Sequence, residues 1–211
     1  MYVQDCMTLT PLTVRPESDP MAALMVIKYH GFRHLPVLDN DGNLVGIVDR
    51  DDLEKFLSTA GAPTVLKRQH RVEQVMTRDV VTVTPSCPLE EAALLMVENK
   101  IGSLPVMDGG QLVGIITKTD IFKQFAAVLG GGTDSFRLTV QVADTPGQLA
   151  QLSSRIAKVN GNISSLVAYP ADKPGRQNLT LRVQGVDQEA VLMAISDQPE
   201  LEVLDGWGCS E

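Results

Sequence analysis

The sequence is poor in three features, and each shortage argues against a class of protein. Its three cysteines, Cys6, Cys87 and Cys209, lie far apart and in no Cys-x-x-Cys or Cys/His spacing, which indicates packing or surface residues and neither a disulfide framework nor a zinc site. Lys and Arg number 18 against 26 Asp and Glu. The net charge of -8 disfavours attraction to nucleic acid or anionic membranes.

No apolar run approaches the roughly 20 residues that a membrane span needs, and no charged-then-apolar segment follows Met1. We therefore expect a cytoplasmic protein whose partners include neither nucleic acid nor membrane. Its three histidines and its acids form no arrangement of base, nucleophile or metal ligands. We expect no catalytic residue, no cofactor and no metal.

What the chain does contain is a duplication. The stretch that begins at Leu104-Pro-Val106 and ends at Thr117-Lys-Thr-Asp120 is repeated, with one extra turn residue, from Leu35-Pro-Val37 to Asp49-Arg-Asp-Asp52. Agreement of order, spacing and chemistry over about 60 residues indicates a paired module. We assign residues 1–60 to the first repeat, 61–71 to a linker with a basic cluster at 67–71, and 72–129 to the second repeat.

Within each repeat the pattern predicts a helix, a hairpin and a second helix. In the first repeat a strand at residues 13–15 precedes a helix that Ser18 or Asp19 caps and Gly31 ends. Strands are then expected at 34–38 and 44–48, joined by the turn at 39–42. Residues 89–97 form the corresponding amphipathic helix of the second repeat.

A third domain follows the glycine-rich linker at 130–134, because three consecutive glycines suit neither helix nor strand. Residues 135–211 predict the order βαββαβ, which is the ferredoxin-like motif with two helices on one sheet face. The fold class is therefore α/β (α+β). The uncovered sheet face and the free sheet edge favour a homodimer.

The junction at Thr117 and Asp120 has two interpretations. Free N–H groups at a helix start can bind a phosphate, and a carboxylate can accept two hydrogen bonds from a ribose diol. Alternatively, Thr117 is a simple N-cap and Asp120 favours the first helical turn. The residues alone leave both open.

Gly114-x-x-Thr117-x-x-Asp120 and Leu104-Pro-Val106 resemble the signature of CBS domains, and two tandem copies resemble the Bateman module. The resemblance covers about residues 1–127 and implies an adenine nucleotide or related regulatory ligand. It implies that Thr117 and Asp120 hold the ribose. The remaining contacts that it implies come from the first repeat: Thr13, Phe32, Arg33 and His34.

The first repeat departs from the signature because Asp49 stands where Thr is expected. A carboxylate there adds negative charge beside a phosphate. Its opposite wall, at Ile101, Gly102 and Ser103, supplies no cation. We therefore expect a weaker second nucleotide site, formed by Asp52, Gly102, Ser103 and Thr82.

In the third domain, Asp144-Thr-Pro-Gly-Gln-Leu149 and Gly161-Asn162 resemble ACT domains. That family often binds amino acids at a subunit interface. The resemblance carries this role to Asp144, Gly147, Gln148, Leu149 and Asn162. The alternative is a loop built for packing, in which Pro146 starts the helix and Gly147 permits close approach.

Two CBS repeats followed by an ACT domain resemble the bacterial acetoin-utilisation accessory proteins. We expect a regulatory protein that senses an adenine nucleotide or adenosyl compound, and an amino acid if the ACT interface binds one, with a regulated enzyme as a further partner. Two alternatives stay open. One is a dimerisation scaffold with empty pockets, and the other is a nucleotide-processing enzyme, for which the acids and histidines offer no constellation.

Overall fold

A computed structural model describes residues 1–59, 70–198 and 200–207. Most of the predicted linker at 61–71, with its cations Lys67 and Arg68, lies outside these residues, as does Cys209. The chain divides into two compact units, Met1–Phe122 and Lys123–Glu211. No helix within the described ranges is long and apolar enough to cross a membrane.

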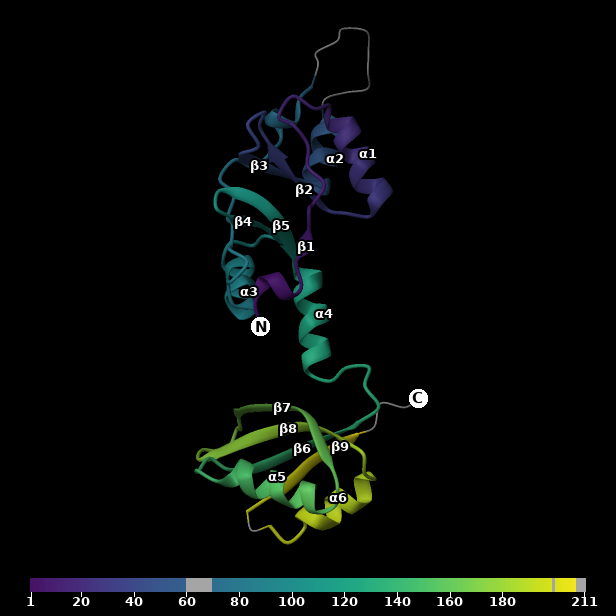
Figure 1. The fold of residues 1–211 in the computed structure, drawn as a ribbon, viewed down its shortest axis with the longest axis vertical. Coiled ribbons are helices and arrows are strands. Elements are labelled where there is room, and N and C mark those ends of the chain that lie inside the picture. The colour runs from purple at the N-terminus through teal and green to yellow at the C-terminus, as the bar shows by residue number, and fades with distance from the viewer. Residues whose placement is uncertain (60–69, 199, 208–211) are drawn as a thin grey trace. The chain divides into compact units, whose positions relative to one another are not determined.

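The first repeat has the predicted helices and hairpin (Figure 1). Helix α1 (Pro20–His30) begins at Asp19, whose side chain accepts a hydrogen bond from the Met21 N–H, and ends at Gly31 with φ 69°. Strands β2 (His34–Leu38) and β3 (Leu44–Asp49) pair antiparallel, and α2 (Arg50–Thr59) follows. The strand predicted at 13–15 is reduced to one parallel bridge between Val14 and Val37.

The second repeat has the same elements in the same order. They are α3 (Leu89–Glu98), β4 (Ser103–Asp108), β5 (Gln111–Thr117) and α4 (Lys118–Val128). The first residues of the chain join this repeat, because β1 (Thr8–Leu9) pairs antiparallel with β5. Thr77 makes the equivalent antiparallel bridge to Ile47 of β3.

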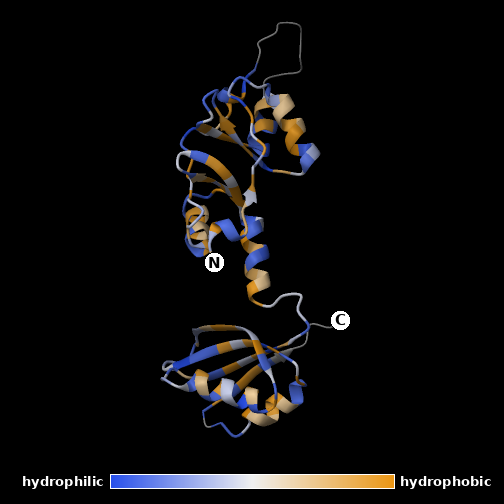
Figure 2. Ribbon diagram, viewed as in Figure 1, coloured by the Kyte–Doolittle hydropathy of each residue, from blue (hydrophilic) through white to orange (hydrophobic). Residues whose placement is uncertain are grey.

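The two repeats therefore exchange their leading segments. Short 3-10 helices form at η1 (Val3–Asp5) and η2 (Val72–Gln74). The Val3 N–H donates to the Cys87 carbonyl at 2.9 Å, and the Val72 N–H donates to the Ser18 carbonyl at 2.9 Å. Figure 2 shows hydrophobic residues along α1 and the strands of this unit. Val72 and Met76 belong to the buried cluster of the first repeat, together with Ala23, Leu24, Ile27, Leu35, Val37, Val48 and Leu53.

The second unit has the predicted βαββαβ order. Its elements are β6 (Phe136–Ala143), α5 (Gln148–Lys158), β7 (Asn162–Pro170), β8 (Arg176–Gln184), α6 (Gln188–Ile195) and β9 (Glu202–Trp207). The sheet order is β7-β8-β6-β9 with every pair antiparallel. Both helices cover one face of this sheet (Figure 1). Alternate β6 residues, Leu138, Val140 and Val142, are fully buried in the core under them.

The opposite face of this sheet is polar. Thr139 and Gln141 of β6 are only 4% and 6% exposed although no helix covers them. Their neighbours on β8 cover them, since Thr139 contacts Thr180 and Gln141 donates to Asn178. Arg176 also lies at this face and donates to the Gln141 carbonyl. On β6 and β8 the uncovered face therefore carries polar side chains that contact one another.

Candidate functional site

Two equivalent corners lie where each hairpin enters its helix. In the second repeat β5 ends at Thr117, and the Lys118 N–H donates to the Gly102 carbonyl at 3.0 Å. In the first repeat β3 ends at Asp49, and the Arg50 N–H donates to the Arg33 carbonyl at 2.8 Å. Both corners therefore share one backbone arrangement, and their side chains set them apart.

The corner at Thr117 is held by three reciprocal hydrogen bonds between Thr117 and Asp120. The Thr117 hydroxyl donates to Asp120 Oδ2 at 2.7 Å, and the Thr117 N–H donates to the same oxygen at 2.9 Å. The Asp120 N–H in turn donates to Thr117 Oγ1 at 3.3 Å. These contacts are those of the N-cap interpretation. They also fix a half-buried carboxylate whose lone pairs can accept further hydrogen bonds from a ligand.

Cys6 lies close to this corner, which sequence reasoning missed. Burial raises the pKa of the Cys6 thiol, and the negative charge of Asp120 raises it further. The sequence signal for this neighbour is that Met7-Thr8 recurs as Met76-Thr77 at the start of the second repeat. Thr8 pairs with Ile115 of β5. The leading segment therefore forms one side of the Thr117 corner.

The corner at Asp49 has different side-chain contacts. Asp49 Oδ1 accepts from the Asp51 N–H at 2.6 Å, and Asp49 Oδ2 lies 2.9 Å from His34 Nε2. His34 also reaches the second repeat, because a Cβ on Gly102 would lie 3.0 Å from His34 Cε1. Burial lowers the pKa of His34, while the charge of Asp49 opposes that change. Asp49 is thus a helix cap bound to a histidine.

The other residues predicted for the tighter site lie on the surface of the first repeat. Arg33 forms an exposed ion pair with Asp51 at 2.9 Å, and Phe32 stacks on His30 with ring centroids 5.4 Å apart. Thr13 is exposed. Among the described residues, no hydrogen bond or ion pair joins these side chains to Thr117 or Asp120.

The residues predicted for the weaker site are partly brought together. Gly102 meets His34, and Ser103 is the next residue and is buried. Asp52 lies exposed in the first turn of α2, and Thr82 is exposed before Val83. Among the described residues Asp49, and not Asp52, contacts His34, the residue that meets Gly102.

The five residues predicted in the ACT domain fall into two groups. Asp144 follows β6, Gly147 precedes α5 with φ 93°, and Gln148 accepts a hydrogen bond from Gln198. Leu149 is 44% exposed beside them. The fifth residue, Asn162, begins β7.

Asp144 and Asn162 lie at opposite ends of the sheet. Strands β6 and β7 both pair antiparallel with β8, so they run parallel to each other. Ala143 pairs with Arg176 at one end of β8, whereas Asn162 pairs with Gln184 at the other end. Eight residues of strand separate these ends, about 25 Å at roughly 3.3 Å per residue. One copy of the domain therefore does not bring Asp144 and Asn162 to one small ligand.

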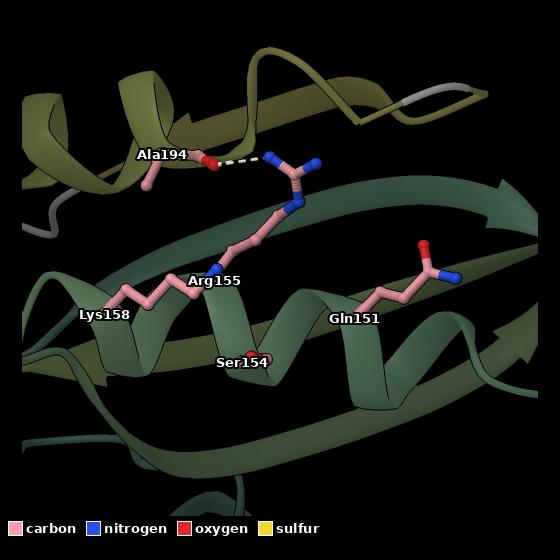
Figure 3. A pocket seen from close by; sticks show the side chains of 5 residues that line it. All are labelled: Gln151, Ser154, Arg155, Lys158 and Ala194. Carbon is pink, nitrogen blue, oxygen red and sulfur yellow. Dashed lines mark hydrogen bonds between the residues drawn. The ribbon is translucent and has the colours of Figure 1, made fainter.

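A shallow pocket lies elsewhere in this domain, between α5 and α6 (Figure 3). Arg155 donates from Nη1 to the Ala194 carbonyl at 3.0 Å, and Lys158 lies one turn farther along α5. No residue of the predicted amino-acid site lines it. Over residues 1–59, 70–198 and 200–207 no group of three or more His, Cys, Asp and Glu residues could hold a metal ion.

Comparison with known families gives two matches. Residues 3–59 and 72–127 match the CBS domain family, and residues 131–205 match the TTHA0829-like ACT domain. A curated relative, the L-aspartate semialdehyde sulfurtransferase of Methanocaldococcus jannaschii, is 32% identical over 124 residues. The match covers 58% of this chain but only 23% of the enzyme.

Three solved structures are similar to the paired repeats. The CBS domain pair of protein MJ0100, in complex with 5′-methylthioadenosine and S-adenosyl-L-methionine, has a TM-score of 0.53 at 30% identity over 60% of this chain and 97% of its own. CBSX2 in complex with AMP has a TM-score of 0.51 at 30% identity, over 60% of this chain and 97% of its own. A putative acetoin utilization protein (AcuB) from Vibrio cholerae has a TM-score of 0.54 at 32% identity, over 62% of this chain and 93% of its own.

Proposed function

The chain belongs to the CBS-domain family, with two CBS domains followed by an ACT domain, and from this membership we propose that it is a regulatory protein that senses an adenosyl ligand. The observation that carries the proposal is the Thr117 and Asp120 corner, where a fixed carboxylate stands at a helix start. Similar CBS pairs were solved with AMP and with S-adenosyl-L-methionine, which supports this ligand class.

In this proposal Asp120 accepts hydrogen bonds from the ribose diol, and Thr117 and the first N–H groups of α4 face the phosphate or its equivalent. Arg33, Phe32 and Thr13 are proposed for the remaining contacts. Arg33 suits an anion because its guanidinium always carries charge and can grip two oxygens. His34 is bound to Asp49, so we assign it to the other corner.

An amino-acid site on the ACT domain requires two copies of the chain. Antiparallel pairing of β7 with its symmetry mate would bring Asn162 of one copy to the end of the sheet that carries Asp144 of the other. The edge strand β7 is available for such pairing in this unit. We therefore propose a homodimer. Light scattering tests it, and a monomer at micromolar concentration would remove this amino-acid site.

The controlled partner is proposed to be an enzyme, with the chain itself performing no chemistry. The sulfurtransferase relative supports this view, because the matching region is a minor part of that enzyme. A role in acetoin utilisation rests on the likeness to AcuB. The scaffold alternative is favoured by an apolar stripe on α1, where Met25 is 63% and Tyr29 is 87% exposed.

A thermal-shift panel separates these functions. The panel comprises AMP, ATP, GMP, S-adenosylmethionine and the common amino acids. A ligand at 100 times its dissociation constant stabilises the folded chain by about 2.7 kcal/mol. We expect adenosyl compounds to raise the melting temperature and GMP to leave it unchanged. No shift with any compound supports the scaffold, and conversion of a nucleotide in the same incubations supports an enzyme.

A further inference from the structure

The two corners differ at one pair of cross-strand neighbours. His34 pairs with Asp49 at the open end of the β2–β3 hairpin, and Ser103 pairs with Thr117 at the same place in the β4–β5 hairpin. Directly opposed residues of antiparallel strands carry their side chains on the same face, close enough to interact. The larger side chains of His34 and Asp49 thus stand in the first repeat where the smaller side chains of Ser103 and Thr117 stand in the second.

In the first repeat this pair closes on itself. His34 Nε2 lies 2.9 Å from Asp49 Oδ2, and the two side chains are only 16% and 28% exposed. The imidazole is held from the other side by Gly102 of the second repeat, where a Cβ would come within 3.2 Å of Nε2. Arg33 and Asp51 are the other charged groups that act on the ring. His34 therefore lies against Gly102 where the two repeats meet.

In the second repeat no such bridge forms. Ser103 is 4% exposed, and its hydroxyl has no hydrogen-bond partner among the described residues. Thr117 directs its own hydroxyl to Asp120, along the helix start. The serine side chain is too short to close the corner as His34 does. The carboxylate of Asp120 is left half-buried at this helix start.

We propose that His34 and Asp49 form a latch that closes the corner of the first repeat, so that each chain takes one adenosyl ligand, at Thr117 and Asp120. This inference rests on the proposed function. A nucleotide at the first corner would have to displace a charge-assisted hydrogen bond of a half-buried pair, which weakens binding about 10- to 100-fold. The latch thus sets the stoichiometry of the CBS pair.

Exchange of the two residues for their counterparts tests the latch. The variant H34S/D49T gives the first corner the Ser and Thr of the second. Calorimetry with AMP should then show a second site whose affinity is similar to that of the first. H34Q keeps a side-chain N–H donor toward Asp49 and should stay at one site. H70S, at a histidine whose described ring contact is Phe56 in the second half of α2, is the matched control and should stay at one site. Circular dichroism confirms that each variant is folded.

Two AMP sites of similar affinity in the wild-type chain, or no second site of similar affinity in folded H34S/D49T, would overturn the latch. Absence of AMP binding in every variant would overturn the proposed function instead. The latch itself is then decided without ligand, by NMR of the histidine ring protons. The His34 signal should move in D49T and stay in D41N, whose carboxylate lies in the hairpin turn, and an unmoved signal in D49T would reject the latch.

Discussion

At the scale of single residues, His34 makes the stability of the chain depend on pH. Burial lowers the pKa of His34 in the folded state, against the opposing charge of Asp49, while Arg33 lowers it further. The unfolded chain therefore takes up a proton first, near the ordinary value of about 6.5, as the pH falls. Proton uptake by the unfolded state lowers the free energy of unfolding below that pH.

We predict that the wild type loses more stability than H34Q between pH 7.5 and pH 5.5, because glutamine takes up no proton. Urea unfolding at the two pH values measures the difference. Asp49 and Asp51 act in the opposite sense on His34, so a wild type that gains stability on acidification relative to H34Q would show that the ion pair outweighs burial.

Two glycines of the repeated motif are fixed by packing. A Cβ on Gly46 would lie 2.6 Å from Met76 Sδ and 3.0 Å from the Thr77 carbonyl, and a Cβ on Gly114 would lie 2.7 Å from Met7 Sδ. Gly46→Ala and Gly114→Ala should each destabilise the chain by about 1–3 kcal/mol, because backbone closes one side of each site. Ser58→Ala, on the exposed surface of α2, is the control within about 0.5 kcal/mol. Urea unfolding decides, and a neutral Gly46→Ala would contradict this packing.

At the scale of elements, the exchanged leading segments tie the repeats together. Val3 and Val72 are both fully buried, and each lies against the other repeat. Val3→Ala and Val72→Ala should each cost about 1.5–3 kcal/mol, from two lost methyl groups and the cavity left behind. Hydrogen exchange should show that each substitution lowers amide protection in the other repeat. Val3→Ala should lower it in β4 and β5, and Val72→Ala should lower it in β2 and β3. Loosening confined to the neighbouring sequence would contradict the exchange.

The sequence predicts most elements because their signals are local. Asp19 and Gly31 bound α1 as capping chemistry requires, and the hairpin at 39–42 forms where Asp39 accepts from Asn43. The pairing of Thr8 with β5 has no such signal, since a strand of two residues shows no periodicity. A long-range partner decides it.

One feature of the sites was within reach of the sequence and one was not. Counting back from the Leu38 and Leu44 pair beside the turn places His34 opposite Val48, and a bulge between Val37 and Leu38 shifts the observed partner to Asp49. A βαβ unit with parallel strands places the end of the first strand and the start of the second at opposite ends of the sheet, which separates Asp144 from Asn162. The family resemblance assigned Asp144 and Asn162 to one site because it transfers residue identities. It does not say which copy of the chain supplies each residue.

At the scale of the whole molecule, the two units have separate cores and separate proposed ligands. The buried cluster of the second unit is drawn entirely from its own strands and helices, from Leu138 to Ile195. The proposed nucleotide corners lie in the first unit, and the proposed amino-acid site of the ACT domain would combine residues of two copies of the chain. A single chain thus offers one complete candidate site, at Thr117 and Asp120.

Calorimetric titration of AMP into the wild type, Asp120→Ala and Asp52→Ala tests this central claim most directly. Loss of the Asp120 carboxylate removes charge-assisted hydrogen bonds of about 1.5–3 kcal/mol, so binding should weaken roughly 10- to 100-fold. Asp52 belongs to the closed corner, and its replacement should leave the affinity within about twofold of the wild type. Retained binding in folded Asp120→Ala, or equal losses in the two variants, would contradict the account.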